Sequence, residues 1–411
     1  MRVQRCKGTR DLSPEEMLRF RLIEGDFRDR CLKWGYQEVR TPTIEYLHLF
    51  TSTGTLTSSM LSKVYSFLDW DGWSGERVVL RPDGTIPVVR LYIDSMEGKG
   101  LAKLFYVSNI FIFEETGEEI RERWQCGAEL IGASSPLTDV ELVSLSLETM
   151  KKLRLEGVEL RLSHAGLIKA LLAKLGLNPE EQTSIFAQIL DENGEVLGRI
   201  KTERPELENI LLPLLNMKGK SSGFLKNLKV LSAQSVPEVK PYLDDFVSIV
   251  ELLDALGYDY RIDIASGIGF EYYTGVIFQL FIGEEKIGGG GRYETLIPAM
   301  GGGDIPASGF ALYLDRLMNL VKPKILAKPP APRILVRGEG KDVLKETFHV
   351  ASRLREIGYV AQLNLDGQEP AGLRWVLDVK NKAPLFILQD KVKSTRIEAQ
   401  TIDEVLQAIQ S

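Results

Sequence analysis

A stretch of about 55 residues, from 263 to 317, restricts the fold of this chain more than any other part of the sequence. It contains a tyrosine pair at 272–273, followed by an aromatic and β-branched run that is typical of a strand. A run of glycines at 288–291 then permits a close backbone approach or a positive φ angle. Near Gly309 the leucine spacing becomes helical. Strands and helices are mixed within one short region, which predicts an α+β fold.

Length and composition limit the classes of protein that need to be considered. A chain of 411 residues predicts two or three domains, and a hydrophobic content of 44% is ordinary for a globular protein. The sequence has no apolar run of about 18 residues, so we expect no transmembrane helix. The amino terminus lacks the apolar core of a signal peptide. The net charge of −6 gives no support for non-specific nucleic-acid binding, and these features together predict a cytoplasmic protein without membrane contact.

The cysteines and histidines do not indicate a disulfide framework or a metal site. Cys6, Cys31 and Cys126 are odd in number and far apart, which suits a reducing compartment. The three histidines do not cluster with cysteine, so a structural zinc site is not expected. We predict no cofactor.

The amino-terminal region predicts a helix followed by a broken strand. Ser13 and Glu16 have the spacing of a capping box, with a proline at the first helical position. Gly35 then ends the apolar helical pattern, and the extended run after it is interrupted at Pro42. From the residue pattern alone, dimerisation through this helix and simple core packing are equally well supported.

The middle of the chain contains two further helical patterns. Residues 138–155 predict a helix whose polar face carries Asp139, Glu141 and Glu148. Residues 158–172 predict a strand that runs directly into a helix, with His164 at the junction. We interpret His164 as a packing or capping residue rather than a catalytic one.

Two groups of polar residues are candidates for a binding site. Asp83 and Thr85 flank a glycine after a short strand, a pattern that by itself is typical of an ordinary turn. Residues 103–132 predict two antiparallel strands joined by an acidic loop. Gln125 and Glu129 are four residues apart on the second strand and therefore lie on the same face. The alternative is a half-buried sheet face whose polar groups bond to the backbone.

These segments resemble the active-site core of the histidyl-tRNA synthetases and their relatives. The matching motifs are a Gly-x-x-Tyr-Tyr strand at 269–273, a Gly-Gly-Arg-Tyr turn at 290–293 and a class II motif that ends in Asp-Arg-Leu at 315–317. The resemblance implies a class II aminoacyl-tRNA synthetase-like antiparallel sheet with helices, a helical insertion and a small C-terminal α/β domain.

The same resemblance implies a histidine pocket. A glutamine and two carboxylates beside aromatic rings suit a small cationic ligand with an imidazole ring. The residues that correspond to histidine-binding positions of the family are Asp83, Thr85, Gln125, Glu129, Tyr272 and Tyr273. In addition, Arg316 is the candidate for a residual nucleotide contact.

Two arginines that the synthetases use to activate histidine are missing from this sequence. The family's second motif reads Phe-Arg-x-Glu, whereas this chain has Ile112 at the arginine position. The arginine that precedes the Gly-x-x-Tyr-Tyr glycine is replaced by Ile268. An isoleucine neither donates hydrogen bonds nor neutralises charge that develops on a phosphate oxygen. We therefore predict that the chain is not an enzyme.

One subfamily of synthetase relatives fits the sequence more closely. It is the regulatory subunit of ATP phosphoribosyltransferase, which has Arg-Pro-Asp, Tyr-Tyr-Thr-Gly and Asp-Arg-Leu, as this chain does at 81–83, 272–275 and 315–317. This resemblance implies a non-catalytic chain that a short-form catalytic subunit needs for activity in the first step of histidine biosynthesis. It also implies feedback sensing of histidine and a homodimer within a larger hetero-oligomer, with no role for tRNA. The alternatives are a histidyl-tRNA synthetase with divergent arginine placement, or a paralogue that aminoacylates another acceptor.

The predicted domains are a synthetase-like core at 1–321 with a helical insertion at about 166–256, a proline-containing linker at 322–332, and an anticodon-binding-like α/β domain at 333–411. In the last domain, strands alternate with helices, and residues 372–382 are predicted to be helical. This βαβαβ pattern predicts a small sheet with right-handed crossovers.

Overall fold

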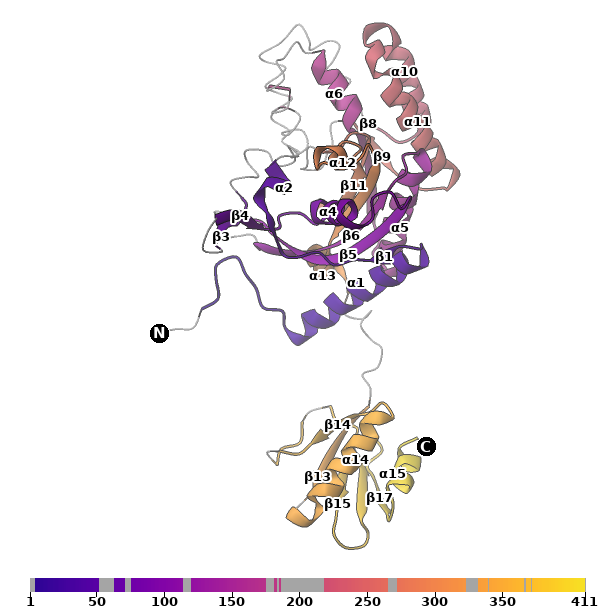
Figure 1. Cartoon of the computed structure of the whole chain (residues 1–411). Helices are drawn as coiled ribbons and strands as arrows, with labels where there is room; N and C mark the ends of the chain where they lie inside the picture. Colours follow the sequence, from indigo (N-terminus) through magenta and orange to yellow (C-terminus); the bar gives the residue numbers. More distant parts are fainter. Residues whose placement is uncertain are drawn as a thin grey trace. The chain divides into compact units, whose positions relative to one another are not determined.

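The computed structural model describes residues 4–51, 63–70, 75–113, 120–174, 181–182, 185, 218–264, 272–322, 332–338, 340–365, 367–370 and 372–410. The chain divides into two compact units, residues 1–322 and residues 323–411. Most of the predicted linker lies outside the described residues. The α+β fold class predicted from the sequence is confirmed (Figure 1).

The first unit is built around a large, mostly antiparallel sheet. Its strands follow the order β1-β5-β6-β12-β11-β10-β7-β9-β8, and only the β1–β5 and β7–β9 pairs are parallel. The bounds are β1 Gln37–Glu38, β5 Ala102–Phe111, β6 Glu122–Ile131, β7 Val158–His164, β8 Lys218–Gly219, β9 Arg261–Asp263, β10 Val276–Ile282, β11 Glu285–Arg292 and β12 Ala307–Tyr313.

The glycine run lies within β11, between β10 and β12. A Cβ atom added to Gly288 would lie 2.7 Å from the carbonyl oxygen of Ala311, and one added to Gly290 would meet the backbone of Gly309. The glycines therefore allow close backbone approach, and none of the four has a positive φ angle. Close approach was one of the two roles predicted for this run.

The helix predicted to begin near Gly309 begins later. Residues 307–313 form β12, which pairs with β6 on one side and with β11 on the other. Helix α13, Leu314–Leu320, follows directly. Helices cover both faces of the sheet, so most residues of β12 are buried whichever face they lie on, and its apolar residues do not alternate and resemble a helical pattern.

Helices cover both faces of this sheet (Figure 1). On the face that we call the back face, α1 (Pro14–Lys33) places Phe27 edge-on against Phe105 at 6.0 Å and Phe310 at 6.3 Å between ring centroids. Helix α5 (Pro136–Lys152) covers the same face against β12. The predicted capping box of Ser13 and Glu16 is confirmed at the start of α1.

The opposite face, which we call the front face, carries α4 (Thr85–Ser95) over β6. A small antiparallel sheet of order β2-β4-β3 precedes α4 in the chain. Its bounds, and those of the short helices of this unit, are β2 Ile44–Tyr46, β3 Ser66–Trp70, β4 Gly75–Leu80, α2 Leu47–Thr51 and α12 Leu296–Ala299.

A group of helices follows β7 in the chain. Helix α6 (Ala165–Ala173) begins at the end of β7, and α10 (Ser222–Ser235) packs against α11 (Lys240–Ala255), with the 3₁₀ turn η2 (Pro237–Val239) between them. Helix α11 also contacts α5. The helical insertion stays a prediction for residues 186–217, which lie outside the described part of the chain.

The second unit has a five-stranded sheet of order β14-β13-β15-β16-β17. Residues 372–382 were predicted to be helical, and this prediction is wrong, because they contain β15, a central strand buried on both faces. The bounds are β13 Arg333–Gly338, η4 Lys341–Val343, α14 Leu344–Glu356, β14 Val360–Leu363, β15 Trp375–Val379, β16 Phe386–Asp390, β17 Thr395–Ala399 and α15 Ile402–Gln410. Across both units, none of the described helices has the length and apolar character needed to cross a bilayer.

Candidate ligand-binding site

Glu129 stands at the centre of the front face, with small residues beside it. Its cross-strand partner on β12 is Gly309, and the partner of Gly309 on β11 is Gly291. Directly paired residues of antiparallel strands lie on the same face. A Cβ atom at Gly309 would meet the Glu129 carboxylate, and a Cβ atom at Gly291 would lie 2.7 Å from the Tyr273 ring. The glycines therefore supply the room that these side chains occupy.

The carboxylate of Glu129 is fully buried, with 0% exposure. Thr85 donates a hydrogen bond to Oε1 at 2.9 Å, and the Tyr293 hydroxyl donates one to Oε2. Burial raises the pKa of Glu129 to about 8, although the two hydroxyl bonds partly oppose this effect. Among the described residues, no basic side chain forms an ion pair with Glu129.

Asp83 is the second buried carboxylate of the front face. Its Oδ2 accepts a hydrogen bond of 2.8 Å from the backbone N–H of Ile86, in the first turn of α4. Burial raises the pKa of Asp83 to about 6, against the effect of the backbone N–H groups around it. The predicted turn at 83–85 is therefore a helix start that fixes both Asp83 and Thr85.

Three tyrosines surround the two carboxylates. The rings of Tyr272 and Tyr273 lie 4.8 Å apart, and Tyr272 meets Tyr293 edge-on at 5.5 Å. All three side chains are buried. The tyrosine pair lies just before β10 rather than inside it. The ring of Tyr106 lies in the same region, since a Cβ atom at Gly84, the residue after Asp83, would meet this ring.

Gln125 lies on the same face, two same-face rows of cross-strand pairs nearer the start of β6, with the Gly127–Tyr106 pair between it and Glu129. Its partner on β5 is Ser108, and both side chains are buried. Gln125 Oε1 and Ser108 Oγ have no hydrogen-bond partner among the described residues. Buried polar atoms are costly without partners, so this pair is suited to a polar ligand group.

A pocket of about 490 Å³ begins at Gln125 and extends beyond it. Arg316 and Ile112 both line it, and Arg316 donates to the carbonyl oxygen of Lys286 at 2.8 Å. Arg10 reaches into the pocket wall and forms an ion pair of 2.5 Å with Asp315. The full lining is Arg10, Ile110, Ile112, Ile120, Arg123, Trp124, Gln125, Lys286, Tyr313, Asp315, Arg316 and Asn319.

The structure thus places the residues predicted for the site close together. One residue of the sequence prediction, Ile268, is not among those described. Asp83, Thr85, Glu129, Tyr272 and Tyr273 form one cluster, which we call the Glu129 cluster together with Tyr106 and Tyr293. Gln125 connects this cluster to the pocket that contains Arg316.

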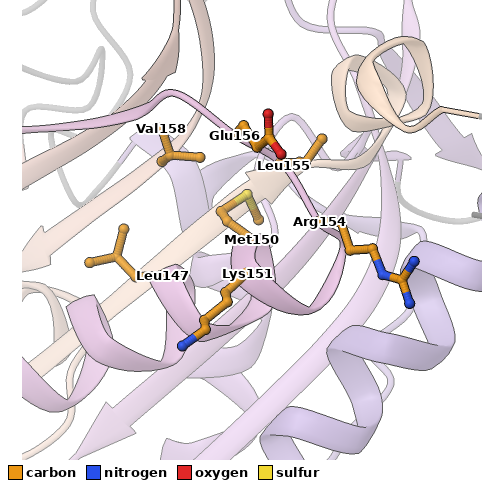
Figure 2. Close-up of a pocket in the computed structure, with 7 residues that line it drawn as sticks. All are labelled: Leu147, Met150, Lys151, Arg154, Leu155, Glu156 and Val158. Atoms are coloured by element: carbon orange, nitrogen blue, oxygen red, sulfur yellow. The ribbon is translucent and has the colours of Figure 1, made fainter.

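A second pocket, of about 390 Å³, lies at the end of α5 (Figure 2). Four apolar and three charged side chains line it (Figure 2). It contains none of the residues predicted for a site. The lining residues are Leu147, Met150, Lys151, Arg154, Leu155, Glu156 and Val158.

Sequence reasoning missed several residues of the site region. Tyr293 belongs to the Gly-Gly-Arg-Tyr motif, yet its bond to Glu129 could be found only from the fold. Asp139 was predicted on a polar helix face, and this prediction is wrong: it is 2% exposed and forms an ion pair with Arg292. The capping role predicted for His164 is confirmed, since Nδ1 accepts from the backbone N–H of Leu167.

In the part of the chain that the structure describes, no group of three or more histidine, cysteine, aspartate or glutamate residues is arranged to hold a metal ion. The described site is therefore built from carboxylates, hydroxyls and aromatic rings. These are the kinds of groups that orient small polar ligands in protein pockets.

Comparisons with known proteins identify the family of this chain. A family model described as histidyl-tRNA synthetase matches residues 8–317. The ATP phosphoribosyltransferase regulatory subunit of Dehalococcoides mccartyi strain BAV1 is 52% identical over 404 residues, which cover 98% of each chain. The histidine–tRNA ligase of Methanocaldococcus jannaschii is 32% identical over 92% of this chain and 89% of its own length.

Among solved structures, a Bacillus halodurans protein described as an ATP phosphoribosyltransferase regulatory subunit/histidyl-tRNA synthetase has the same fold. Its TM-score is 0.76 at 22% identity, covering 90% of this chain and 94% of that one. With its extensive identity to the regulatory subunits and its match to the synthetase model, the chain belongs to the histidyl-tRNA synthetase-like family of ATP phosphoribosyltransferase regulatory subunits.

Proposed function

We propose that this chain is the non-catalytic regulatory subunit that a short-form ATP phosphoribosyltransferase catalytic chain needs for activity. The catalytic chain would join ATP to phosphoribosyl pyrophosphate in the first step of histidine biosynthesis, in the cytoplasm. The identity of 52% over almost the whole chain to proteins named as such regulatory subunits supports this proposal. It predicts a specific complex between the two kinds of chain.

The pocket that contains Arg316 supports the proposal that the chain does not activate histidine. Ile112 lines this pocket at the position where the resemblance places a catalytic arginine. An apolar side chain there offers no charge to the phosphate oxygens of a reacting nucleotide. Ile268 is the second such replacement in this proposal. Arg316 is retained as a candidate contact for a bound nucleotide.

Histidine is the ligand that we propose for the Glu129 cluster. Glu129 and Asp83 are buried carboxylates, and the aromatic rings of Tyr272 and Tyr273 lie beside them. Histidine would bring an imidazole N–H donor and an ammonium group to these acceptors, and its binding would report the level of the pathway's end product. The proposed contact residues are Asp83, Thr85, Gln125, Glu129, Tyr272 and Tyr273.

The second candidate function is that of a histidyl-tRNA synthetase, or of a paralogue acting on another acceptor. The observation in its favour is the set of basic side chains around the pocket, Arg10, Arg123, Lys286 and Arg316, with Asp315 as the acidic one. Basic groups of this kind would suit nucleotide phosphates, although position 112 is an isoleucine and not an arginine.

For the assembly, we propose a homodimer within a larger hetero-oligomer. The small sheet β2-β4-β3 exposes large apolar side chains, including Tyr46, Leu68 and Trp70. Apolar side chains gathered on a surface are typical of a protein interface. Sedimentation of the purified chain, alone and with the catalytic chain, measures both assemblies.

The experiment that tests the main proposal combines two assays on the purified chain. The first adds it to a purified short-form catalytic chain and measures phosphoribosyl-ATP formation, which we expect only in the mixture. The second measures histidine-dependent ATP–pyrophosphate exchange against an active synthetase, and we expect none. Exchange comparable to the control, with no stimulation in the first assay, would overturn the regulatory function and favour the synthetase.

A further inference from the structure

We propose that Arg292 is a positioning residue that couples the Glu129 cluster to helix α11, so that ligand binding and the position of this helix influence each other. This inference rests on the proposed function for its ligand, histidine. Contacts on the two faces of β11 provide the coupling. On one face Arg292 contacts two helices, and on the other its neighbours form the site.

On the back face, the guanidinium of Arg292 connects α5 with α11. It forms ion pairs with Asp139 of α5 and, at 3.0 Å, with Asp245 of α11. Asp139 also accepts a hydrogen bond of 3.2 Å from Ser308 on β12. The Arg292 side chain therefore joins β11 to two helices, and Asp139 extends this connection to β12. Figure 1 shows α5 and α11 on the same side of the first unit.

On the front face, the backbone around Arg292 fixes the site. Its carbonyl oxygen accepts from the N–H groups of Thr274, at 2.9 Å, and Gly275, at 3.3 Å, directly after the tyrosine pair. The next residue, Tyr293, donates to the buried carboxylate of Glu129. A displacement of Arg292 is therefore transmitted to both sides of the Glu129 cluster through main-chain bonds.

The contact with α11 is the one able to change. The side chain of Asp245 is 26% exposed, whereas that of Asp139 is 2% exposed. Asp245 also contacts Nε2 of His164 at 3.1 Å, and Nδ1 of His164 caps α6. Because Nδ1 accepts a hydrogen bond, the proton of the neutral ring lies on Nε2 and is donated to Asp245. Asp245 thus joins α11 to α6 as well as to Arg292.

This geometry lets a ligand change the position of α11, provided that the ligand binds one of two positions of β11 more tightly than the other. A ligand that bonds to Glu129 competes with the Tyr293 hydroxyl, and Tyr293 is joined to Arg292 by one peptide bond. If the ligand binds one position of this segment more tightly than the other, its binding shifts the position of Arg292 and so changes the contact with Asp245. Reciprocally, a change in the Asp245 contact alters the affinity for the ligand. The partly exposed α11 contact yields before the buried α5 contact does.

The experiment compares Asp245→Asn with Asp244→Asn. Asparagine keeps the shape of the side chain but removes its charge toward Arg292. Asp244 is the matched control, because it is the preceding residue of α11 and its carboxylate pairs with the exposed side chains of Lys229 and Lys240. His164→Asn is a second variant, since asparagine is a favoured helix N-cap and preserves the start of α6 while removing the contact with Asp245.

The first readout is amide hydrogen exchange of Thr274 and Gly275 in the ligand-free protein. We expect exchange about tenfold faster in Asp245→Asn, faster in the same direction in His164→Asn, and unchanged in Asp244→Asn. Equal exchange in wild type and in both Asp245→Asn and His164→Asn would overturn the inference, whether or not the protein binds histidine.

The second readout is the histidine concentration that half-inhibits the complex with the catalytic chain. We expect it to change at least fivefold in Asp245→Asn and to stay the same in Asp244→Asn, with activation in the absence of histidine retained. If the exchange result holds while wild type binds no histidine, the coupling stands and the proposed ligand fails. If histidine inhibits wild type and Asp245→Asn equally, the coupling fails and the ligand stands.

Discussion

Two buried carboxylates on opposite faces of the large sheet differ in what surrounds them. Glu129, on the front face, accepts hydrogen bonds only from the hydroxyls of Thr85 and Tyr293 among the described residues. Asp139, against the back face, is bound by the guanidinium of Arg292 and the hydroxyl of Ser308. Burial raises the pKa of Glu129 to about 8 but that of Asp139 only to about 6.

This difference in surroundings indicates a structural role for the Asp139 carboxylate and leaves the Glu129 carboxylate suited to a ligand. The positive charge of Arg292 offsets the burial of Asp139, so this pair holds helix and sheet together without a ligand. Among the described residues, Glu129 has hydroxyl donors but no such cation, so its carboxyl group favours the protonated form near neutral pH. A ligand that donates hydrogen bonds or brings positive charge would supply what the front face lacks.

The largest expected effect is a change in the pH dependence of stability in Glu129→Gln. The pKa of Glu129 is 4.5 in the unfolded reference and about 8 in the folded protein, so the folded state binds more protons between these values. Stability of the wild type should therefore fall as pH rises from 4.5 to 8 and level off above. The loss is at most roughly 5 kcal/mol, and Glu129→Gln should lack it.

Urea denaturation of the ligand-free proteins between pH 5 and pH 9 measures this difference. Asp304→Asn, an exposed change outside the site, is the control and should follow the wild type. Parallel stability curves for wild type and Glu129→Gln would show that the carboxylate is ionised in the folded protein. The contrast between the two faces would then disappear.

Removing the cation on the back face is expected to cost about 3–5 kcal/mol, because Arg292→Met leaves Asp139 buried without a counter-charge and removes one partner of Asp245. Denaturation at pH 7 measures the loss. Arg21→Met is the matched control, since this arginine is largely exposed and its partner, Glu24, also pairs with Arg28. A loss as small as that of the control would mean that Asp139 is held by hydrogen bonds alone.

Much of the front face could be predicted from the sequence, because its information is local. The alternation of side chains along a strand puts Gln125 and Glu129 on one face. The glycine run indicated a close backbone approach as one of two roles before any partner was known. These features depend on neighbours within a few residues.

The back face could not be predicted in the same way. Asp139 and Arg292 are 153 residues apart in the chain, and an aspartate in the first turn of a helix is typical of an exposed helix start. Strands β12 and β15 were predicted to begin or form helices because both are buried on two faces and lack alternation. Only tertiary pairing distinguishes such runs from helices.

A smaller effect is expected for Tyr293→Phe, which removes one of the two hydroxyl donors to Glu129. The buried acceptor is left with Thr85, and we expect a loss of about 1–3 kcal/mol at pH 8.5, where Glu129 is ionised in a larger fraction. The loss should shrink at pH 6, where the carboxyl group is protonated and its bonds matter less. Denaturation at the two pH values checks the trend, and a loss that does not depend on pH would contradict it.

The smallest effects come from a matched pair of hydroxyl deletions, Thr85→Val on the front face and Ser308→Ala on the back face. Each removes one donor to a buried carboxylate, at 2.9 Å for Thr85 and 3.2 Å for Ser308. A hydrogen bond of this kind contributes about 1 kcal/mol, and more when no other charge is present to stabilise the acceptor. At pH 8.5 we therefore expect Thr85→Val to cost more than Ser308→Ala, because Arg292 continues to stabilise Asp139. If histidine bonds to Glu129, adding it should reduce the difference between the stability losses of the two variants. Equal losses without ligand would show that the two carboxylates are equally well stabilised by their surroundings.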